Sequence, residues 1–357
     1  MLRNQLKLLG KLYAKIPKKV IAITVLFKIY LLVIGTASLI SSCNEEKKPT
    51  QLNDVENNIA ISSASSNTHT IPQEAWQAPD ESTIPKNPKG EMIRYGKDLI
   101  ANTSAYFGPK GRLGTFTNGL NCQNCHLDAG TRIFANNYAA VMSSYPKVTA
   151  RSGKVTSPVA RIKGCFERSL NGKMPDSTSK EIRAMLAYME WLNQGVKDPE
   201  NMYGRGTEKI ALLNRPADPK KGALLYSSKC QSCHGENGEG IAAAGGNTFV
   251  YPPLWGKLSY NDGAGIYRLS NFAGFIKNNM PFGATYKNPI LTDEESWDIA
   301  AYVNSQTRPH KDQKADYPNL KKKPIDAPYG PYGDQFSEKQ HKYGPFQPIK
   351  NTYKTKT

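Results

Sequence analysis

The stretches Cys122-Gln-Asn-Cys-His126 and Cys230-Gln-Ser-Cys-His234 decide the fold expected for this chain. Each has the form Cys-x-x-Cys-His, the attachment signature of a c-type haem. Two thiols on one short turn can add to the two vinyl groups of a haem, and the histidine that follows then lies under the iron. The sequence therefore predicts two covalent haems. The expected attachment residues are Cys122, Cys125, Cys230 and Cys233, and the expected proximal iron ligands are His126 and His234.

A zinc site or a redox dithiol is the alternative interpretation of a Cys-x-x-Cys pair. Zinc-binding pairs usually lie about 15–20 residues apart and contribute to one four-ligand cluster. Here the two pairs begin 108 positions apart, at Cys122 and Cys230, and a histidine directly follows each pair. This spacing favours haem over zinc.

The 357-residue chain is strongly basic, with a formal net charge of +17. Seven basic residues precede Cys43 with no acidic residue among them, which leaves about +10 for the rest of the chain. A basic surface favours anionic partners. The sequence has no basic helix or aromatic–basic motif typical of nucleic-acid binding, and haem attachment takes place outside the cytoplasm. We therefore expect a small dianionic substrate or an acidic redox protein as partner, and no nucleic acid.

The first 43 residues have the pattern of an export signal. Residues 1–19 are basic, residues 20–40 are mainly apolar, and small residues precede Cys43. Ile40-Ser-Ser-Cys43 resembles a lipoprotein signal-peptidase box, which would make Cys43 the acylated first residue of a lipoprotein. The alternative is an uncleaved anchor, because the apolar run is long enough to span a bilayer. Both interpretations predict a membrane-tethered protein of the periplasm or cell envelope, with residues 44–72 as a flexible, polar linker.

A weak internal repeat predicts two domains of one kind. Tyr95-Gly96 before the first signature corresponds to Lys221-Gly222 before the second, and a Met-Pro pair, at Met174 and at Met280, follows each signature. A helix with apolar residues at helical spacing then closes each half, the second one opening with the capping box Thr292-x-x-Glu295. This order of elements resembles the class I cytochrome c fold. We expect a mostly α chain with two such domains in tandem, at 73–205 and 206–310, and an extended tail at 311–357.

The sixth ligand of each iron determines what that iron can do. Only three further histidines remain in the sequence, His69 in the linker and His310 and His341 near the tail. Bis-histidine ligation of both irons is therefore not expected. For the second iron, Met280 is the expected ligand, 46 residues after His234. A thioether ligand raises the reduction potential, which suits an electron carrier.

The residues alone leave two candidates for the sixth ligand of the first iron. Met174 holds the class I position, 48 residues after His126, whereas the thiol of Cys165 lies 39 residues after it and has no other assigned role. Cys165 lies in a stretch of helical spacing flanked by arginine and lysine. Positive neighbours favour the thiolate, the form that binds iron or attacks sulfur.

Three segments carry a resemblance to a known family: Asn121-Cys-Gln-Asn-Cys-His-Leu-Asp-Ala-Gly130, Arg151-Ser-Gly-Lys154 and Arg161-Ile-Lys-Gly-Cys-Phe-Glu-Arg-Ser-Leu-Asn-Gly172. Together they resemble the thiosulfate dehydrogenase/tetrathionate reductase family of dihaem c-type cytochromes. The resemblance runs from about Trp76 to the tail. Its most specific part is the Gly-Cys-Phe-Glu-Arg-Ser run, which ordinary cytochromes c lack.

The resemblance implies roles for both sixth ligands. It implies Cys165 as the distal ligand of the first, catalytic haem, opposite His126, and electron exchange through the second haem at His234. Some members of the family have a lysine just before the distal methionine of the second haem. Here that position is Asn279, which leaves Met280 as the simpler choice.

The resemblance further implies an enzyme that joins two thiosulfate ions into tetrathionate, or catalyses the reverse, and exchanges electrons with a small redox protein such as a cytochrome c. Both substrate ions are dianions, so cations must offset their repulsion. The family's anion-binding residues map onto Arg151, Arg161 and Ser169, with Lys173 and Arg168 as further candidates. For each arginine the alternative is a haem-propionate partner or a plain surface charge.

Other functions fit the two signatures. A dihaem subunit of a thiosulfate-oxidising complex would act on a cysteine of a partner protein instead of a second thiosulfate. A non-enzymatic dihaem electron carrier would use Met174 and Met280 as its distal ligands. A dihaem peroxidase needs acid–base residues beside an open iron, and none is recognisable here.

Overall fold

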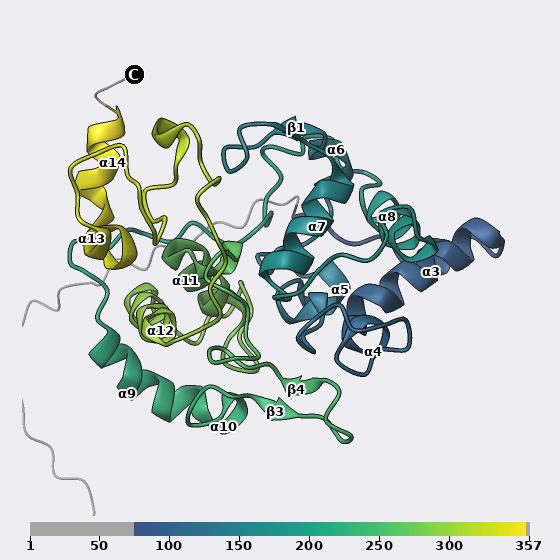
Figure 1. The fold of residues 1–357 in the computed structure, drawn as a ribbon, viewed down its shortest axis with the longest axis horizontal. Helices are drawn as coiled ribbons and strands as arrows, with labels where there is room; N and C mark the ends of the chain where they lie inside the picture. Colours follow the sequence, from purple (N-terminus) through teal and green to yellow (C-terminus); the bar gives the residue numbers. More distant parts are fainter. Residues whose placement is uncertain (1–74, 355–357) are drawn as a thin grey trace, which may run out of the picture. The chain divides into compact units, whose positions relative to one another are not determined.

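The computed structural model describes residues 75–354, and Figure 1 shows their arrangement. The predicted signal or anchor at 1–43, including Cys43, and the predicted linker at 44–72 lie outside the described residues. The described part is mostly helical, as expected, with short antiparallel strand pairs β1 (Lys147–Val148) with β2 (Val155–Thr156) and β3 (Ile241–Ala242) with β4 (Phe249–Tyr251). Within this part, no helix has the length and apolar character needed to cross a membrane.

Most of the buried apolar residues between Ile84 and Leu192 form one cluster, here called the first core. Leu99 and Ile100 pack there with Ile182 and Leu192, all fully buried. Two helices supply these residues, and each begins at a side-chain cap, Asn87 or Ser179, that accepts a backbone N–H. The elements around the first core are η1 (Glu81–Thr83), α3 (Pro88–Ala101), α4 (Thr103–Phe107), η2 (Cys122–Asn124), α5 (Leu127–Gly130), α6 (Val141–Ser144), α7 (Pro158–Arg168) and α8 (Lys180–Leu192).

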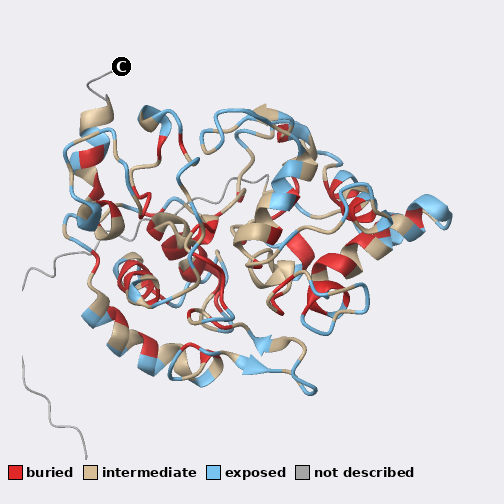
Figure 2. Ribbon diagram, in the orientation of Figure 1, coloured by how far each residue is buried: buried red, intermediate tan, exposed pale blue. Residues whose placement is uncertain are grey.

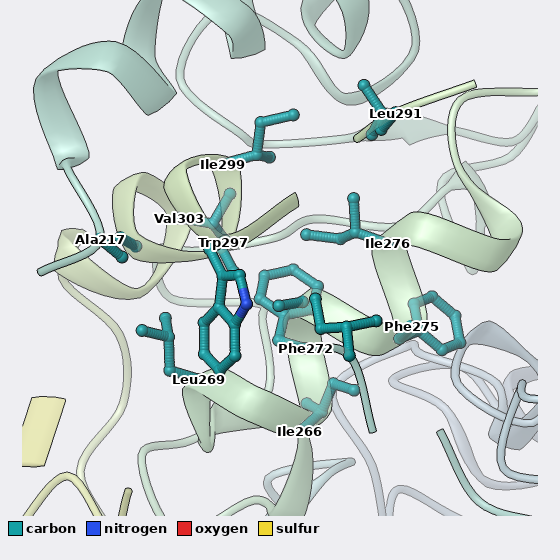
Figure 3. Close-up of a cluster of buried hydrophobic side chains, with 14 of the residues drawn as sticks. Ala217, Ile266, Leu269, Phe272, Phe275, Ile276, Leu291, Trp297, Ile299 and Val303 are labelled. Carbon is teal, nitrogen blue, oxygen red and sulfur yellow. The ribbon is translucent and has the colours of Figure 1, made fainter. Parts of the chain in front are cut away.

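The second core comprises Ala135 and the buried apolar residues from Ile210 to Ile349. Figure 3 shows its centre, where Leu269, Phe272, Trp297 and Val303 lie together. The predicted capping box is present: the Glu295 backbone N–H donates to Thr292 Oγ1 (3.1 Å), and the Thr292 N–H donates to Glu295 Oε2 (2.9 Å). The elements between Pro219 and Ser305 are α9 (Pro219–Lys229), α10 (Gln231–His234), η3 (Gly265–Tyr267), α11 (Leu269–Asn279) and α12 (Asp293–Ser305).

Glycines of the internal repeat lie at two close helix crossings. A Cβ built on Gly96 of α3 would stand 2.0 Å from the carbonyl oxygen of Ala184 in α8. A Cβ built on Gly222 of α9 would stand 1.9 Å from the carbonyl oxygen of Asp298 in α12. Each glycine therefore lets the helix before a haem signature touch the backbone of the helix that closes the same core. Figure 2 shows buried residues along these helices.

The C-terminal segment corrects one expectation. We expected an extended tail at 311–357, but the segment contains η4 (Leu320–Lys322), α13 (Glu338–Tyr343) and α14 (Phe346–Lys354), so the extended description is wrong for 338–354. The physical reason is burial. Phe346 (3% exposed) and Ile349 (0%) are part of the second core, and the Phe346 ring lies 5.6 Å from that of Trp297.

Candidate active site

A cavity with about 900 Å³ of empty space, part of it open to solvent, lies beside the first Cys-x-x-Cys-His signature. Cys122 and His126 of the signature line it together with Arg161 and Cys165 of α7. The first signature and the segment of Cys165, which lies 39 residues after His126, therefore border one cavity. The remaining lining includes Ile100, Tyr138, Tyr145, Ile162, Phe166, Met185 and Met189.

His126 is oriented for metal binding through a single ring nitrogen. Its Nδ1 lies 2.5 Å from the carbonyl oxygen of Asn136, and a carbonyl can only accept, so Nδ1 carries the proton. This leaves Nε2 as the ligand atom, the usual arrangement of a metal-binding histidine. Burial lowers the pKa of His126 to about 4, so the imidazole is neutral, which is the form that binds iron.

His234 of the second signature has the same arrangement. Its Nδ1 lies 2.9 Å from the carbonyl oxygen of Pro252, the residue is 8% exposed, and burial lowers the pKa of its imidazole. Nε2 is again the ring nitrogen left available for a metal. At both signatures, two thiols and a tautomerically fixed imidazole thus form the donor set that a c-type haem requires.

The short loop that holds His126 is attached to the second core. Ala135 is a member of that core, and the backbone N–H of Asn136 donates to the carbonyl oxygen of Gly206 (2.8 Å). The N–H of Phe134 donates to Gly204 (2.8 Å), and its carbonyl accepts from Asn279 Nδ2 (3.3 Å). The position of the first proximal histidine therefore depends on residues from beyond the first core.

Helix α7 carries two functional side chains on one face. Its N-terminus is capped by Ser157, whose Oγ accepts the N–H of Ala160 (3.1 Å). Ile162 and Phe166 anchor the helix in the first core. Arg161 and Cys165, four positions apart, project from the same side of the helix.

The two side chains interact electrostatically. The negative charge of the Cys165 thiolate raises the pKa of the Arg161 guanidinium, and Tyr145 and Tyr138 act in the same direction more weakly, against the effect of burial. The Arg161 side chain is accessible to solvent through the open cavity, and Cys165 is partly buried. The cavity thus brings together a thiol and a guanidinium on one face of α7.

Arg205 is a second cation at the cavity, and sequence analysis missed it. Its guanidinium donates to the carbonyl oxygen of Pro199 (2.5 Å) and to Ser144 Oγ (3.1 Å), and lies 3.3 Å from Glu200 Oε2. Arg205 follows the first core in the chain and lies 40 positions beyond Cys165, outside every motif. No local signal in the sequence marks it.

Two of the predicted anion-binding arginines lie elsewhere. Arg151 donates to the carbonyl oxygen of Gly263 (2.6 Å) and stands 3.8 Å from Asp316. Arg168 makes a bidentate ion pair with Asp316, at 2.9 and 2.7 Å. Neither arginine is among the residues that line the cavity, and both share the carboxylate of Asp316.

Ser169 and Lys173 are also outside the cavity lining. Ser169 is the C-terminal capping residue of α7, where its N–H donates to the carbonyl oxygen of Cys165 (2.9 Å). The Lys173 ammonium lies 5.8 Å from the centre of the Phe116 ring. Of the residues that the family resemblance suggested for binding anions, the structure brings Arg161 to the cavity.

The predicted methionine ligands lie at different cores. Met280 ends α11 and packs, partly buried, against the second core, as does Cys230 of the second signature. Met174 packs against the first core but does not line the cavity beside His126. Asn279 is buried, and its amide donates to the carbonyl oxygen of Phe275 (2.9 Å).

The two tail histidines serve other roles. His310 Nδ1 bonds to Asp262 Oδ2 (2.7 Å). His341 is buried with both ring nitrogens bonded, Nδ1 to the carbonyl oxygen of Ile325 (2.8 Å) and Nε2 to Asp334 Oδ1 (3.0 Å). Both thus take part in hydrogen bonds within the C-terminal part of the chain.

Fold and site together define a c-type cytochrome, and a family model described as Cytochrome c matches residues 219–307, across the second signature. The chain belongs to the thiosulfate dehydrogenase family of enzymes. It is 37% identical over 234 residues to the thiosulfate dehydrogenase of Stutzerimonas stutzeri, covering 66% of this chain and 73% of that protein. It is 40% identical over 242 residues to that of Psychrobacter arcticus (68% and 71%) and 38% identical over 243 residues to that of Allochromatium vinosum (67% and 86%).

A solved structure supports the same assignment. Thiosulfate dehydrogenase (TsdBA) from Marichromatium purpuratum, in its as-isolated form, superposes with a TM-score of 0.61 at 34% sequence identity. The similarity covers 66% of this chain and 50% of that chain, so the aligned part of the present protein spans half the length of the solved one. The predicted family and the prediction of an enzyme are confirmed.

Proposed function

We propose that the protein interconverts two thiosulfate ions and tetrathionate at the cavity beside His126. One observation carries the proposal: Cys165 and Arg161 line the same cavity as Cys122 and His126. A simple electron carrier with methionine ligands has no use for a thiol and a guanidinium at this place. Haems bound covalently at the two signatures would each accept one electron.

We infer two class I cytochrome c-like domains in tandem, at about 73–205 and 206–310, with one haem each. Two similarities between the parts support this inference. Each signature histidine donates Nδ1–H to a backbone carbonyl, and each signature follows a helix that crosses the closing helix at a glycine, Gly96 or Gly222.

For the irons we propose His126 and Cys165 as ligands at the first haem and His234 and Met280 at the second. Cys165 shares the cavity with His126, whereas Met174 does not. Met280 packs on the same core as Cys230. A thiolate ligand suits the reactive site and a thioether the electron-transfer site.

In the proposed reaction the Cys165 thiolate bonds to the outer sulfur of one thiosulfate, which gives a Cys165–S–S–sulfonate and releases two electrons. The outer sulfur of a second thiosulfate then attacks the thiosulfate-derived sulfur of this adduct. The bond from that sulfur to Cys165 breaks, tetrathionate leaves, and the thiolate is restored. Arg161 lies on the same face of α7 as Cys165 and offsets the charges of the two dianions, and Arg205 adds a second guanidinium to the cavity.

We further propose that electrons pass between the second haem and a small redox protein with an acidic face, since the chain is basic. A tether through Cys43, by lipid or by an uncleaved anchor, would place the enzyme in the periplasm or cell envelope. Labelling with a radioactive fatty acid, compared between the natural chain and Cys43→Ala, distinguishes the two kinds of tether.

The proposed function is tested with the purified haem-loaded protein, thiosulfate and ferricyanide alone. Tetrathionate should form without a second protein, which a subunit acting on a partner's cysteine would require. Cys165→Ala should keep both haems, measured by the pyridine haemochrome assay, and lose turnover in both directions. Turnover of Cys165→Ala at the rate of the natural protein would refute the mechanism.

A further inference from the structure

A buried ion-pair network outside the cavity links α7 to the C-terminal segment. Arg168, the last residue of α7, binds Asp316 through both guanidinium nitrogens, at 2.9 and 2.7 Å. The side chains are 16% and 7% exposed. Asp316 also accepts from the hydroxyl of Tyr329 (2.9 Å) and lies 3.8 Å from Arg151. One carboxylate therefore serves two arginines and a tyrosine.

Asn261 also makes hydrogen bonds to the last turn of α7. Its side-chain amide donates to the carbonyl oxygen of Glu167 (2.9 Å) and its backbone N–H donates to that of Arg168 (3.1 Å). The neighbouring Gly263 accepts from Arg168 Nη1 (3.3 Å). A Cβ built on Gly263 would lie 2.7 Å from that nitrogen, so the contact depends on the absence of a side chain.

The segment that carries Asp316 is itself fixed on both sides. Asp262 accepts from the backbone N–H of Lys311 and from Gln313 Nε2, both at 2.8 Å. On the other side, the N–H of Tyr317 donates to the carbonyl oxygen of Arg151 (2.7 Å). Asp316 is thus a charge on a well-anchored segment, and not on a loose tail.

We propose that Asp316 is a positioning residue for Cys165, acting through Arg168. The two side chains of α7 are three positions apart, so they stand one turn apart on the same side of the helix. A bidentate guanidinium–carboxylate pair fixes both distance and plane. It therefore sets the rotation of the last turn of α7, and with it the place of the Cys165 sulfur in the cavity. The proposal rests on the function proposed for Cys165.

The network also explains why Arg168 and Arg151 are absent from the cavity lining. A guanidinium that is largely withdrawn from water needs a counter-charge. Removal of the Asp316 charge would leave Arg168, whose side chain is 16% exposed, with the carbonyl oxygen of Gly263 as its remaining partner among the described residues. The end of α7 would then move with Arg168. The expected consequence is a displaced sulfur in an otherwise folded protein.

The test compares Asp316→Asn with Asp326→Asn in the haem-loaded protein. Asp326 is a matched control because it lies in the same C-terminal segment and pairs with Arg268 (2.8 Å) and Ser270, away from α7. Asp316→Asn should lower kcat about 100-fold, the loss expected for a shift of about 1 Å at a reacting group, and leave KM for thiosulfate nearly unchanged. It should also diminish the thiolate-ligand signals in the electron paramagnetic resonance spectrum. Asp326→Asn should leave the spectrum and kcat as they are.

Arg168→Lys is the second variant, because it keeps the positive charge and loses the bidentate geometry. It should diminish the same spectral signals, and it keeps the proposal testable if Asp316→Asn fails to fold. A natural spectrum and kcat in either folded variant overturns the proposal, and so does an equal spectral change in Asp326→Asn. The alkylation rate of Cys165 by iodoacetamide, followed by mass spectrometry, provides a readout that does not depend on turnover. A several-fold change of the alkylation rate in Asp316→Asn supports a displaced thiol, whatever the activity of the protein. Retained turnover in Cys165→Ala would refute the proposed function alone.

Discussion

The close crossing of α9 and α12 gives the sharpest stability prediction. In Gly222→Ala the new Cβ would lie 1.9 Å from the carbonyl oxygen of Asp298 and 2.8 Å from Tyr302 Cβ, whereas ordinary contact begins near 3.4 Å. Helix α9 would have to withdraw by roughly 1.5 Å, the difference between these distances. Overpacking of this kind costs about 3 kcal/mol, and the better helix propensity of alanine returns about 1 kcal/mol. The expected net loss of stability is about 2 kcal/mol.

Differential scanning calorimetry of the haem-loaded protein measures this effect. A loss of about 2 kcal/mol should lower Tm by roughly 4–8 °C in a protein of this size. Ser228→Ala, at an exposed position of the same helix, is the control and should change stability by less than about 0.5 kcal/mol. A Tm for Gly222→Ala equal to that of the natural protein would show that the helices do not touch at this glycine, and the explanation of the internal repeat would then be wrong.

Three further predictions concern the site and the fold. Arg161→Gln should lower kcat/KM for thiosulfate by about 10²–10³-fold, because it removes the cation beside Cys165, while Lys163→Gln on the exposed face of α7 should have little effect in the same ferricyanide assay. Although burial opposes ionisation of Asp326, Arg268 and Ser270 hold its pKa below the ordinary value, so its contribution to stability should be complete above about pH 4 and should fall as the pH drops below that. Urea unfolding midpoints between about pH 2.5 and 7 should show this acid limb in the natural protein and a flatter one in Asp326→Asn; equal pH profiles would contradict it. Ile349→Ala in α14 should cost about 2–5 kcal/mol in urea unfolding, because Ile349 is fully buried in the second core, whereas the exposed Lys350→Ala should be neutral; equal midpoints would mean that α14 is dispensable.

Local patterns predicted much of the fold. The capping box at Thr292 and Glu295 is a short-range interaction, which the sequence expresses directly. The haem signatures are likewise local, since two thiols and an imidazole on one turn are sufficient to specify the chemistry. The prediction of the family depended on the run around Cys165, which is equally compact.

Long-range electrostatics and burial could not be predicted in this way. Arg205 reaches the cavity, and Asp316 captures Arg168, only because distant segments meet in the folded chain. Arg151 and Arg168 look like free anion-binding residues until their carboxylate partner, 148 positions beyond Arg168, is known. The helices of the C-terminal segment are short, and their apolar residues are buried only through packing against Trp297 and its neighbours. A local sequence pattern does not reveal such packing.

The loop that holds His126 has a consequence for any attempt to divide the protein. Ala135 is embedded in the second core, and Asn136, the acceptor for His126, is hydrogen-bonded to Gly206. A cut between residues 205 and 206 would strip the amino-terminal fragment of contacts that orient its own proximal imidazole. Separately expressed halves should therefore mature poorly alone and recover only when they reassociate, so the two signature regions are expected to fold as one unit.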